Sequence, residues 1–295
     1  MRTKTRRRRT NRRSRNRVAR IDSAETSRKR SVRSTRNGNR NRKHSRKRQF
    51  SGTTVIGGLI LLVLAIMIFS ALRYLFLYVT ESHLSADDRY PVEGVDVSTY
   101  QLEIDWKGLQ SEGVDFAFIK ATEGTTHVDD RFAYNWEEAN RTDLKVGAYH
   151  FLSYDTAGET QAENYINIVE KKRSSLPPVV DVEFYGKYID KHPSREKLQT
   201  TLNIVLEKLE QHYKKKPIIY TNTYIYNTYI SGEYDQYDIW ISNPDLPEKL
   251  PDEREWTFCQ YTFKGKSQYV ANGKKYVDRN VFNGTKWEFR KYDGK

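Results

Sequence analysis

Short β-like runs alternate with helical stretches between residues 92 and 284, and this alternation constrains the fold more than any other feature of the chain. Strands that alternate with helices form parallel sheets, because each helix carries the chain back to the edge where the next strand starts. Eight such runs, with helices mainly in the first five units, predict an α/β barrel whose last part has lost its helices. The expected strands are Gly94–Val97, Phe116–Lys120, Val146–Phe151, Val179–Phe184, Pro217–Thr221, Asp238–Ile241, Trp256–Tyr261 and Tyr276–Asp278.

Three of the connecting segments have the apolar spacing of helices. In the longest, apolar side chains recur at steps of three and four residues from Leu198 to Leu209, which indicates an amphipathic helix packed on a core. The expected helices are residues 131–140, 160–171 and 195–213.

Asp181 and Glu183 lie two residues apart in Pro178–Phe184, a run that otherwise predicts a buried strand. Side chains alternate across a strand with a period of two, so both carboxylates point the same way, with Cα atoms roughly 6.6 Å apart. Such a pair suits glycosidic bond cleavage, because one acid protonates the leaving oxygen and the other stabilises or traps the positive charge on the sugar carbon. The alternative is an edge strand with two solvated acids, which the apolar flanks disfavour.

Other expected strands also end in polar or ionisable residues, among them Asp96, Lys120, Tyr149 and Asn222. In a parallel barrel the C-terminal strand ends meet at one mouth, where such enzymes gather their chemistry. We therefore expect a site at the mouth of an irregular TIM-like (β/α) barrel.

Metal and cofactor chemistry have little support in the sequence. His127 and His150 have neither HxH nor HExxH spacing, and outside the apolar segment at residues 51–72 there is no glycine-rich phosphate loop. None of the serines lies in a G-x-S-x-G turn. We predict no metal and no cofactor.

Charge divides the chain into unlike parts. Residues 1–50 contain 22 Lys or Arg against Asp22 and Glu25, a net of +20, and the chain's +13 minus this +20 leaves −7 for the other 245 residues. The basic segment has almost no apolar side chains that could form a core. It predicts a disordered basic tail, and no nucleic-acid partner is required.

Residues 51–72 contain no charged residue, and as a helix they would span about 33 Å, against about 30 Å for the hydrocarbon layer of a membrane. With the aromatic cluster that follows, they predict a transmembrane anchor over residues 51–79 and a juxtamembrane linker over 80–91. A cleaved signal peptide is the alternative. Its apolar region is about 7 to 15 residues long and ends in a small-x-small site, which this segment lacks.

The charges that flank the anchor predict its orientation. Arg46–Arg48 directly precede it, and Lys and Arg accumulate on the cytoplasmic side of a membrane. We expect a single-pass protein of the cell membrane with a cytoplasmic N-terminus and an extracellular domain that faces the cell wall. The basic tail can also bind anionic lipid headgroups, or serve only as the topology signal.

Eight blocks of sequence between Val92 and Gly284 resemble, in order and spacing, those of the glycoside hydrolase family 25 muramidases. Any one block is weak evidence of a relationship, but eight in register are specific. The blocks are GVDVSTYQLEIDW, FIKATEG, GAYHF, DVE, IIYTN, DIWISN, WTFCQYT and VDRNVF.

The resemblance implies a lysozyme of the Chalaropsis type, which cleaves the β-1,4 bond between N-acetylmuramic acid and N-acetylglucosamine in peptidoglycan. Glu183 matches the proposed general acid and Asp181 its strand partner. Asp96 and Asp278 match two further acids, which we assign to substrate positioning and electrostatics. The aromatic positions that shape the sugar cleft match Tyr149, Tyr220 and Trp240.

Three mechanisms stay open at this point. Carboxyl separations of about 5 Å favour retention and about 6.5 to 9.5 Å favour inversion. In the third, substrate-assisted route, which we favour, the 2-acetamido oxygen attacks and Asp181 steadies the resulting ring. A peptidoglycan-binding barrel without turnover is the alternative to an enzyme, and the four retained acids argue against it.

Two departures from the family pattern qualify the resemblance. Ser242–Pro244 replace the usual small residue and aromatic after the sixth strand, and residues 285–295 are expected to form a short charged tail without wall-binding repeats. A membrane tether could replace a wall-binding module by holding the enzyme near its substrate. Local opening of the wall for a secretion or conjugation apparatus is a role that such a tethered enzyme could serve.

Overall fold

The computed structural model describes residues 61–73 and 89–294. Residues 61–73 form a helix whose side chains are exposed. Within the two described ranges, no helix combines the length and apolar character needed to cross a membrane. The expected basic tail at residues 1–50, the first part of the expected anchor at 51–60, and residues 74–88 lie outside the described residues.

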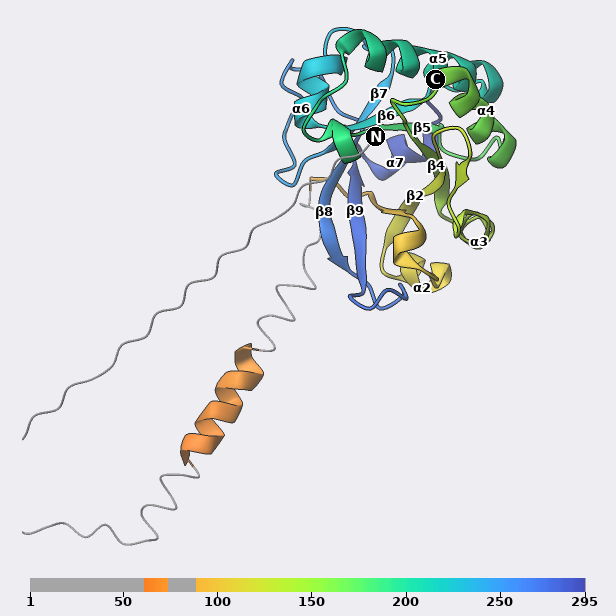
Figure 1. Ribbon diagram of the computed structural model, residues 1–295. Coiled ribbons are helices and arrows are strands. Elements are labelled where there is room, and N and C mark those ends of the chain that lie inside the picture. The colour runs from red at the N-terminus through yellow and green to blue at the C-terminus, as the bar shows by residue number, and fades with distance from the viewer. Residues whose placement is uncertain (1–60, 74–88, 295) are drawn as a thin grey trace, which may run out of the picture. The chain divides into compact units, whose positions relative to one another are not determined.

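Eight strands close into a barrel, which confirms the eight-stranded α/β architecture predicted from the sequence (Figure 1). Around the barrel the order is β1, β2, β4, β5, β6, β7, β8 and β9, and β9 pairs with β1 to close the ring, while the short β3 pairs with the end of β2. The strands are β1 (Glu93–Val97), β2 (Val114–Glu123), β3 (His127–Val128), β4 (Lys145–Phe151), β5 (Val179–Val182), β6 (Ile218–Asn222), β7 (Asp238–Ser242), β8 (Phe258–Lys266) and β9 (Tyr276–Phe282).

The barrel is mixed rather than wholly parallel. From β1 to β8 the neighbouring barrel strands are parallel, but β9 runs antiparallel to both β8 and β1. The expectation of parallel strands is therefore wrong for the last strand. The connection from β8 to β9 covers only residues 267–275, which suits a hairpin, whereas a parallel crossover needs a dozen or more residues.

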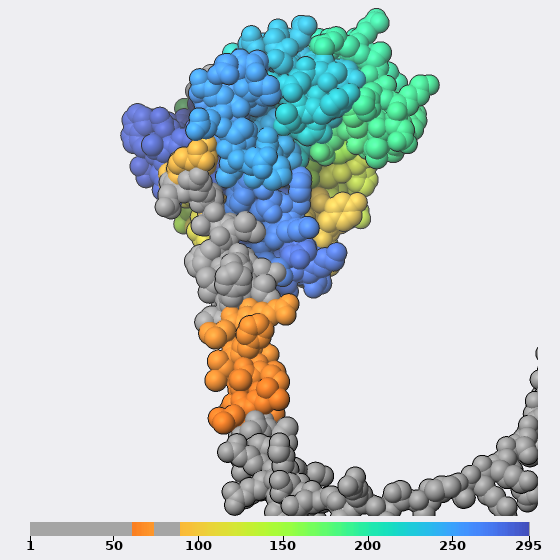
Figure 2. Space-filling model, turned by 90° about the vertical axis from the view of Figure 1, so that its left-hand side faces the viewer, coloured from red at the N-terminus to blue at the C-terminus, as the bar shows by residue number. Residues whose placement is uncertain are grey.

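Apart from α7, the helices of residues 89–294 lie outside the barrel and follow the first five strands of the ring, as expected. Figure 1 shows α4 and α5 side by side next to β4 and β5, and these helices pack on each other. Figure 2 shows the flank on the left of Figure 1, where the cyan to blue part of the chain forms most of the surface. Within residues 89–294 the helices are η1 (Thr99–Gln101), α2 (Trp106–Ser111), α3 (Phe132–Ala139), α4 (Gly158–Ile168), η2 (Gly186–Tyr188), α5 (Arg195–Tyr213), α6 (Thr223–Ile225), η3 (Tyr226–Ile230) and α7 (Lys286–Lys291).

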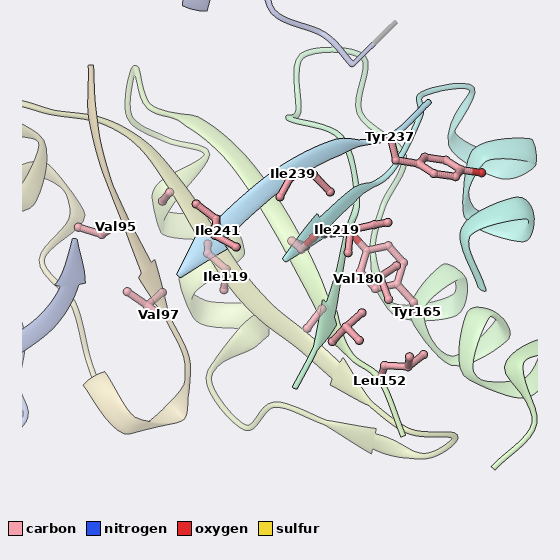
Figure 3. Close-up of a cluster of buried hydrophobic side chains, with 14 of the residues drawn as sticks. Val95, Val97, Ile119, Leu152, Tyr165, Val180, Ile219, Tyr237, Ile239 and Ile241 are labelled. Atoms are coloured by element: carbon pink, nitrogen blue, oxygen red, sulfur yellow. Dashed lines mark hydrogen bonds between the residues drawn. The ribbon is translucent and has the colours of Figure 1, made fainter. Parts of the chain in front are cut away.

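Strand alternation separates two apolar clusters. In β5, Val180 and Val182 point outward into a cluster that contains the inner face of α5, whereas Val179 points into the barrel. Figure 3 shows part of the outer cluster, with Val180, Ile219 and Ile239 on neighbouring strands. Each fully buried side chain of this size stabilises the fold by about 1.5–3 kcal/mol.

Aromatic side chains fill the end of the barrel where the parallel strands begin, and we call them the floor. Their rings touch edge to face or tilted, with Phe116 and Phe118 centroids 5.8 Å apart and Phe116 and Phe289 centroids 5.4 Å apart. Edge-to-face and tilted contacts of this kind add about 0.5–1.5 kcal/mol beyond burial. The floor consists of Phe116, Phe118, Phe258, Phe282 and Phe289.

The segment after Gly284 belongs to this floor. Residues 285–295 were expected to form a charged tail outside the barrel, but Lys286–Lys291 form α7 and Phe289 is 5% exposed. Lys145 donates from Nζ to three main-chain carbonyl groups at the end of this helix, including that of Phe289 at 2.7 Å. The expectation is corrected because Phe289 and Tyr292, three residues apart in this charged segment, pack against the floor.

Candidate active site

All seven residues assigned from the sequence line one cavity of about 220 Å³ at the mouth of the barrel. They come from six strands or strand ends, which confirms that the chain gathers polar groups where the parallel strands end. The structure thus brings the assigned residues together, while their individual roles stay predictions. The seven residues are Asp96, Tyr149, Asp181, Glu183, Tyr220, Trp240 and Asp278.

Strand β5 aims two carboxyl groups into this cavity. Asp181 follows Val179 on the inward face and is 6% exposed, and Glu183 lies directly after the strand and is half-buried. One carboxyl oxygen of Asp181, Oδ1, is buried and accepts no hydrogen bond from the described residues. This oxygen therefore has no hydrogen-bond donor within the described residues.

Asp278 reaches the same mouth because β9 is antiparallel. The start of β9 lies beside the ends of the parallel strands, and the register places Asp278 directly opposite Asp96 on β1. Around the ring, β9 is four strands from β5 in either direction, so Asp278 faces Asp181 and Glu183 across the mouth. A substrate in the cavity would lie between these two sides.

Asp96 is held by two side-chain amides. Gln260 and Asn280 each donate to its Oδ2 at 2.8 Å. The amide oxygens are occupied in turn, because Tyr220 donates its hydroxyl to Gln260 at 2.8 Å and Trp240 donates Nε1 to Asn280 at 2.8 Å. These bonds orient both amide groups so that their N–H groups point at the carboxylate.

This hydrogen-bond network limits the role of Tyr220 and Trp240, which were expected to shape the sugar cleft. Trp240 is 2% exposed and stacks on Phe118 at a centroid distance of 4.5 Å, and Tyr220 is 6% exposed. Both rings form the base of the cavity and orient the amides above them. They offer little open face to a sugar.

Burial raises the pKa values of the carboxyl groups on β5. For Asp181 burial is the largest cause, the negative charge of Glu183 adds to it, and the pKa lies well above the usual range. Burial likewise raises the pKa of Glu183, with a further contribution from Asp96. The ammonium group of Lys120 opposes both shifts.

The two acids on β1 and β9 are shifted in the same direction. Burial raises the pKa of Asp278 to about 8, and the charges of Asp96 and Glu183 add to the effect. Burial raises the pKa of Asp96 to about 6, while the hydrogen bonds that it accepts lower it. The cluster therefore holds protons near neutral pH, as a general acid requires.

Several residues at the mouth escaped assignment from the sequence. Gln260 and Asn280 could have been found, because each lies two residues along a strand from another inward-facing residue. Lys120 is a cation in the mouth, 2.7 Å from Glu123 and 4.9 Å from the centre of the Phe151 ring. It was noted only as a strand end.

His150 lies on the outer side of the sheet, away from the cavity. Its ring nitrogens contact the Thr122 hydroxyl at 2.7 Å and the Gln161 side-chain oxygen at 3.1 Å, and burial lowers its pKa to about 4. Over residues 61–73 and 89–294, no cluster of three or more His, Cys, Asp or Glu side chains could hold a metal ion.

A cluster of buried carboxyl groups at the mouth of a (β/α) barrel, with two of them on one strand, has the chemistry needed to cleave a glycosidic bond. Residues 95–270 match the glycosyl hydrolases family 25. The chain belongs to this family, which confirms the resemblance of its sequence blocks.

Two relatives and one solved structure illustrate the relationship. Lysozyme M1 from Streptomyces globisporus is 31% identical over 224 residues, covering 70% of this chain and 72% of its own. 

Protein YegX from Escherichia coli K12 is 34% identical over 208 residues, covering 69% of this chain and 74% of its own. A family 25 glycosyl hydrolase from Bacillus anthracis is 50% identical, with a TM-score of 0.67, and the match covers 71% of this chain and 96% of that one.

Proposed function

We propose that this chain is a muramidase that hydrolyses the β-1,4 bond between N-acetylmuramic acid and N-acetylglucosamine in peptidoglycan. The observation that carries the proposal is the set of four carboxyl groups that share one mouth and have raised pKa values. Membership of family 25 and the likeness to Lysozyme M1 support it.

In this proposal Glu183 is the general acid. It is the less buried of the two acids on β5, so it can reach a glycosidic oxygen in the cavity, and its raised pKa keeps the proton available. Asp181 contacts the sugar next to the cleaved bond. Its carboxyl group lines the cavity, where it can accept from the N–H of a 2-acetamido group, as the substrate-assisted route requires.

Asp96 and Asp278 act on the opposite side of the cavity. Asp96 is fixed by two amide donors, so it can position a sugar hydroxyl group through its carboxylate. Asp278 faces Glu183 across the mouth, and the negative charge of Glu183 adds to the burial that raises the pKa of Asp278. Both roles are electrostatic and positional.

The test is release of reducing ends from purified peptidoglycan by the full chain. We expect turnover by the wild type and a loss of about 10²- to 10⁴-fold in Glu183→Gln, because the proton donor is removed. Glu163→Gln, an exposed acid on α4, is the matched control and should keep full activity. Binding of peptidoglycan without release of reducing ends by the wild type would instead favour a catalytically silent, structural barrel.

We also propose that the chain is a single-pass membrane protein with its barrel facing the cell wall. The uncharged residues 51–72 support this, as do the basic residues before them. Within residues 61–73 the helix carries exposed apolar side chains, with Leu61 69% and Phe69 68% exposed, as suits contact with lipid. Held there, the enzyme would open the wall locally, for instance for a secretion or conjugation apparatus.

Localisation is tested by fractionating cells that express the full chain and treating intact cells with protease. We expect the chain in the membrane fraction and the barrel digested from outside once the wall is removed. A variant with Leu64→Arg and Ile68→Arg should leave the membrane fraction, because charges in the hydrocarbon layer are costly. Recovery of the wild type in the soluble fraction would contradict the proposal.

A further inference from the structure

Tyr100 is an exposed aromatic residue held on a fixed turn at the mouth. It lies in η1, directly after β1, and 81% of its surface is exposed. The turn is closed by a capping box, in which Ser98 Oγ accepts from the Tyr100 N–H and Gln101 Oε1 accepts from the Ser98 N–H. Asp129 Oδ2 also accepts from the Thr99 N–H at 2.9 Å. Three side-chain hydrogen bonds therefore hold the main chain that carries the ring.

Phe263 is a second exposed aromatic residue at the mouth, and irregular pairing turns it inward. Gln260 lies opposite Asn280, but Thr262 lies opposite Arg279, so β8 gains one residue on its partner. Asn280 points inward and Arg279 points outward, where it bonds Glu112 at 3.0 Å. Thr262 therefore faces outward and Phe263 faces the mouth. Bulges often re-aim a side chain in this way beside active sites.

The rings of Tyr100 and Phe263 both line the cavity, but the described residues give neither ring a partner. Phe263 is 53% exposed. Within the described residues neither side chain makes a ring contact or a hydrogen bond, whereas the exposed Trp287 ring has the Lys291 ammonium 3.4 Å from its centre. Two unpartnered aromatic rings beside a polar cavity suggest a ligand surface.

We propose that Tyr100 and Phe263, here called the aromatic rim, bind sugar units of the glycan strand that lie beyond the pair being cleaved. This proposal rests on the muramidase function proposed above. Tyr100 follows the end of β1 and Phe263 lies within β8. These strands are the two neighbours of β9, so the rim borders the side of the mouth opposite Glu183. The apolar C–H faces of pyranose rings stack on aromatic faces, and a strand held on the rim is drawn across the acid cluster.

The aromatic rim predicts a dependence on glycan length. On soluble, uncross-linked glycan strands we expect Tyr100→Ala and Phe263→Ala each to raise KM about tenfold with kcat within about twofold, because the rings bind remote from the reacting bond. On the shortest oligosaccharide that is cleaved, both variants should match the wild type. Tyr100→Phe and Phe263→Tyr keep the ring and should retain wild-type KM.

Trp287→Ala is the matched control, since it removes an exposed aromatic residue from α7, at the floor end of the barrel. It should leave KM unchanged on both substrates, and thermal unfolding should show that all variants fold. An unchanged KM in both rim variants, or an equal rise in KM on long and short substrates, would contradict the proposed role of the aromatic rim. Failure of the muramidase function would look different, because the wild type itself would release no reducing ends.

Discussion

The floor and the mouth of the barrel interior are built by the same strands, yet their chemistry is opposite. On β2 the inward series runs from Phe116 and Phe118 to Lys120, and on β5 it runs from Val179 to Asp181. The floor therefore gains stability from burial, whereas the mouth holds ionisable groups against an apolar base. The floor therefore contributes to the acid–base chemistry of the mouth, because its apolar side chains raise the pKa values of the carboxyl groups above it.

The largest expected effect concerns the floor. Phe118→Ala should lower the free energy of unfolding by about 3–5 kcal/mol, since a fully buried ring that contacts Trp240 is lost and a cavity remains. Chemical denaturation of the purified variant measures this. Phe263→Ala is the matched control and should cost less than about 0.5 kcal/mol, because that ring is exposed. Equal costs at the two positions would break the distinction between floor and mouth.

The mouth should respond in activity rather than in stability. Asp181→Asn should reduce kcat by about 10²- to 10³-fold, because a carboxylate that stabilises developing charge is removed. Its free energy of unfolding should not fall, since the change removes a buried acid whose ionisation is unfavourable. Steady-state kinetics and denaturation on the same sample test both statements. A variant that keeps full kcat would remove Asp181 from the mechanism.

The burial of ionisable groups at the mouth should also make the free energy of unfolding depend on pH. The folded chain keeps the proton on Asp278 up to a pKa of about 8, but the unfolded chain loses it near 3.8. The free energy of unfolding therefore falls as the pH rises from about 4 to about 8. Asp278→Asn should flatten this slope and raise stability at pH 7.5 by about 1–2 kcal/mol. An unchanged slope would contradict the assigned burial of this acid.

The smallest expected effect concerns the amides that hold Asp96. Gln260→Ala removes one donor to its carboxylate, so the pKa of Asp96 should rise from about 6 by about one unit. Carbon-13 NMR titration of the carboxyl group measures the change. Thr262→Ala, on the outward face of the same strand, should leave it unchanged. A fall in the pKa after Gln260→Ala would show that the amide does not stabilise the carboxylate.

Much of the site could be predicted from period-two alternation along single strands. That rule placed Asp181 and Glu183 at one mouth, and the alternation of strands and helices predicted the barrel. It did not place Phe263, because the bulge between Gln260 and Thr262 reverses the alternation and leaves no clear mark in the sequence.

The direction of the last strand and the fate of the C-terminal segment were also missed. The short link at residues 267–275 could have indicated a hairpin. The charged residues of α7 concealed Phe289, whose burial depends on contacts with strands far away in the sequence. Such contacts between distant segments cannot be read from local composition.

The central claim is that the carboxyl groups at the mouth cleave one defined bond. Mass spectrometry of muropeptides digested by the full chain tests it most directly, with Glu183→Gln digested in parallel. The account predicts products that end in reducing N-acetylmuramic acid from the wild type and almost none from the variant. Products that end in reducing N-acetylglucosamine, or equal yields from both proteins, would contradict it.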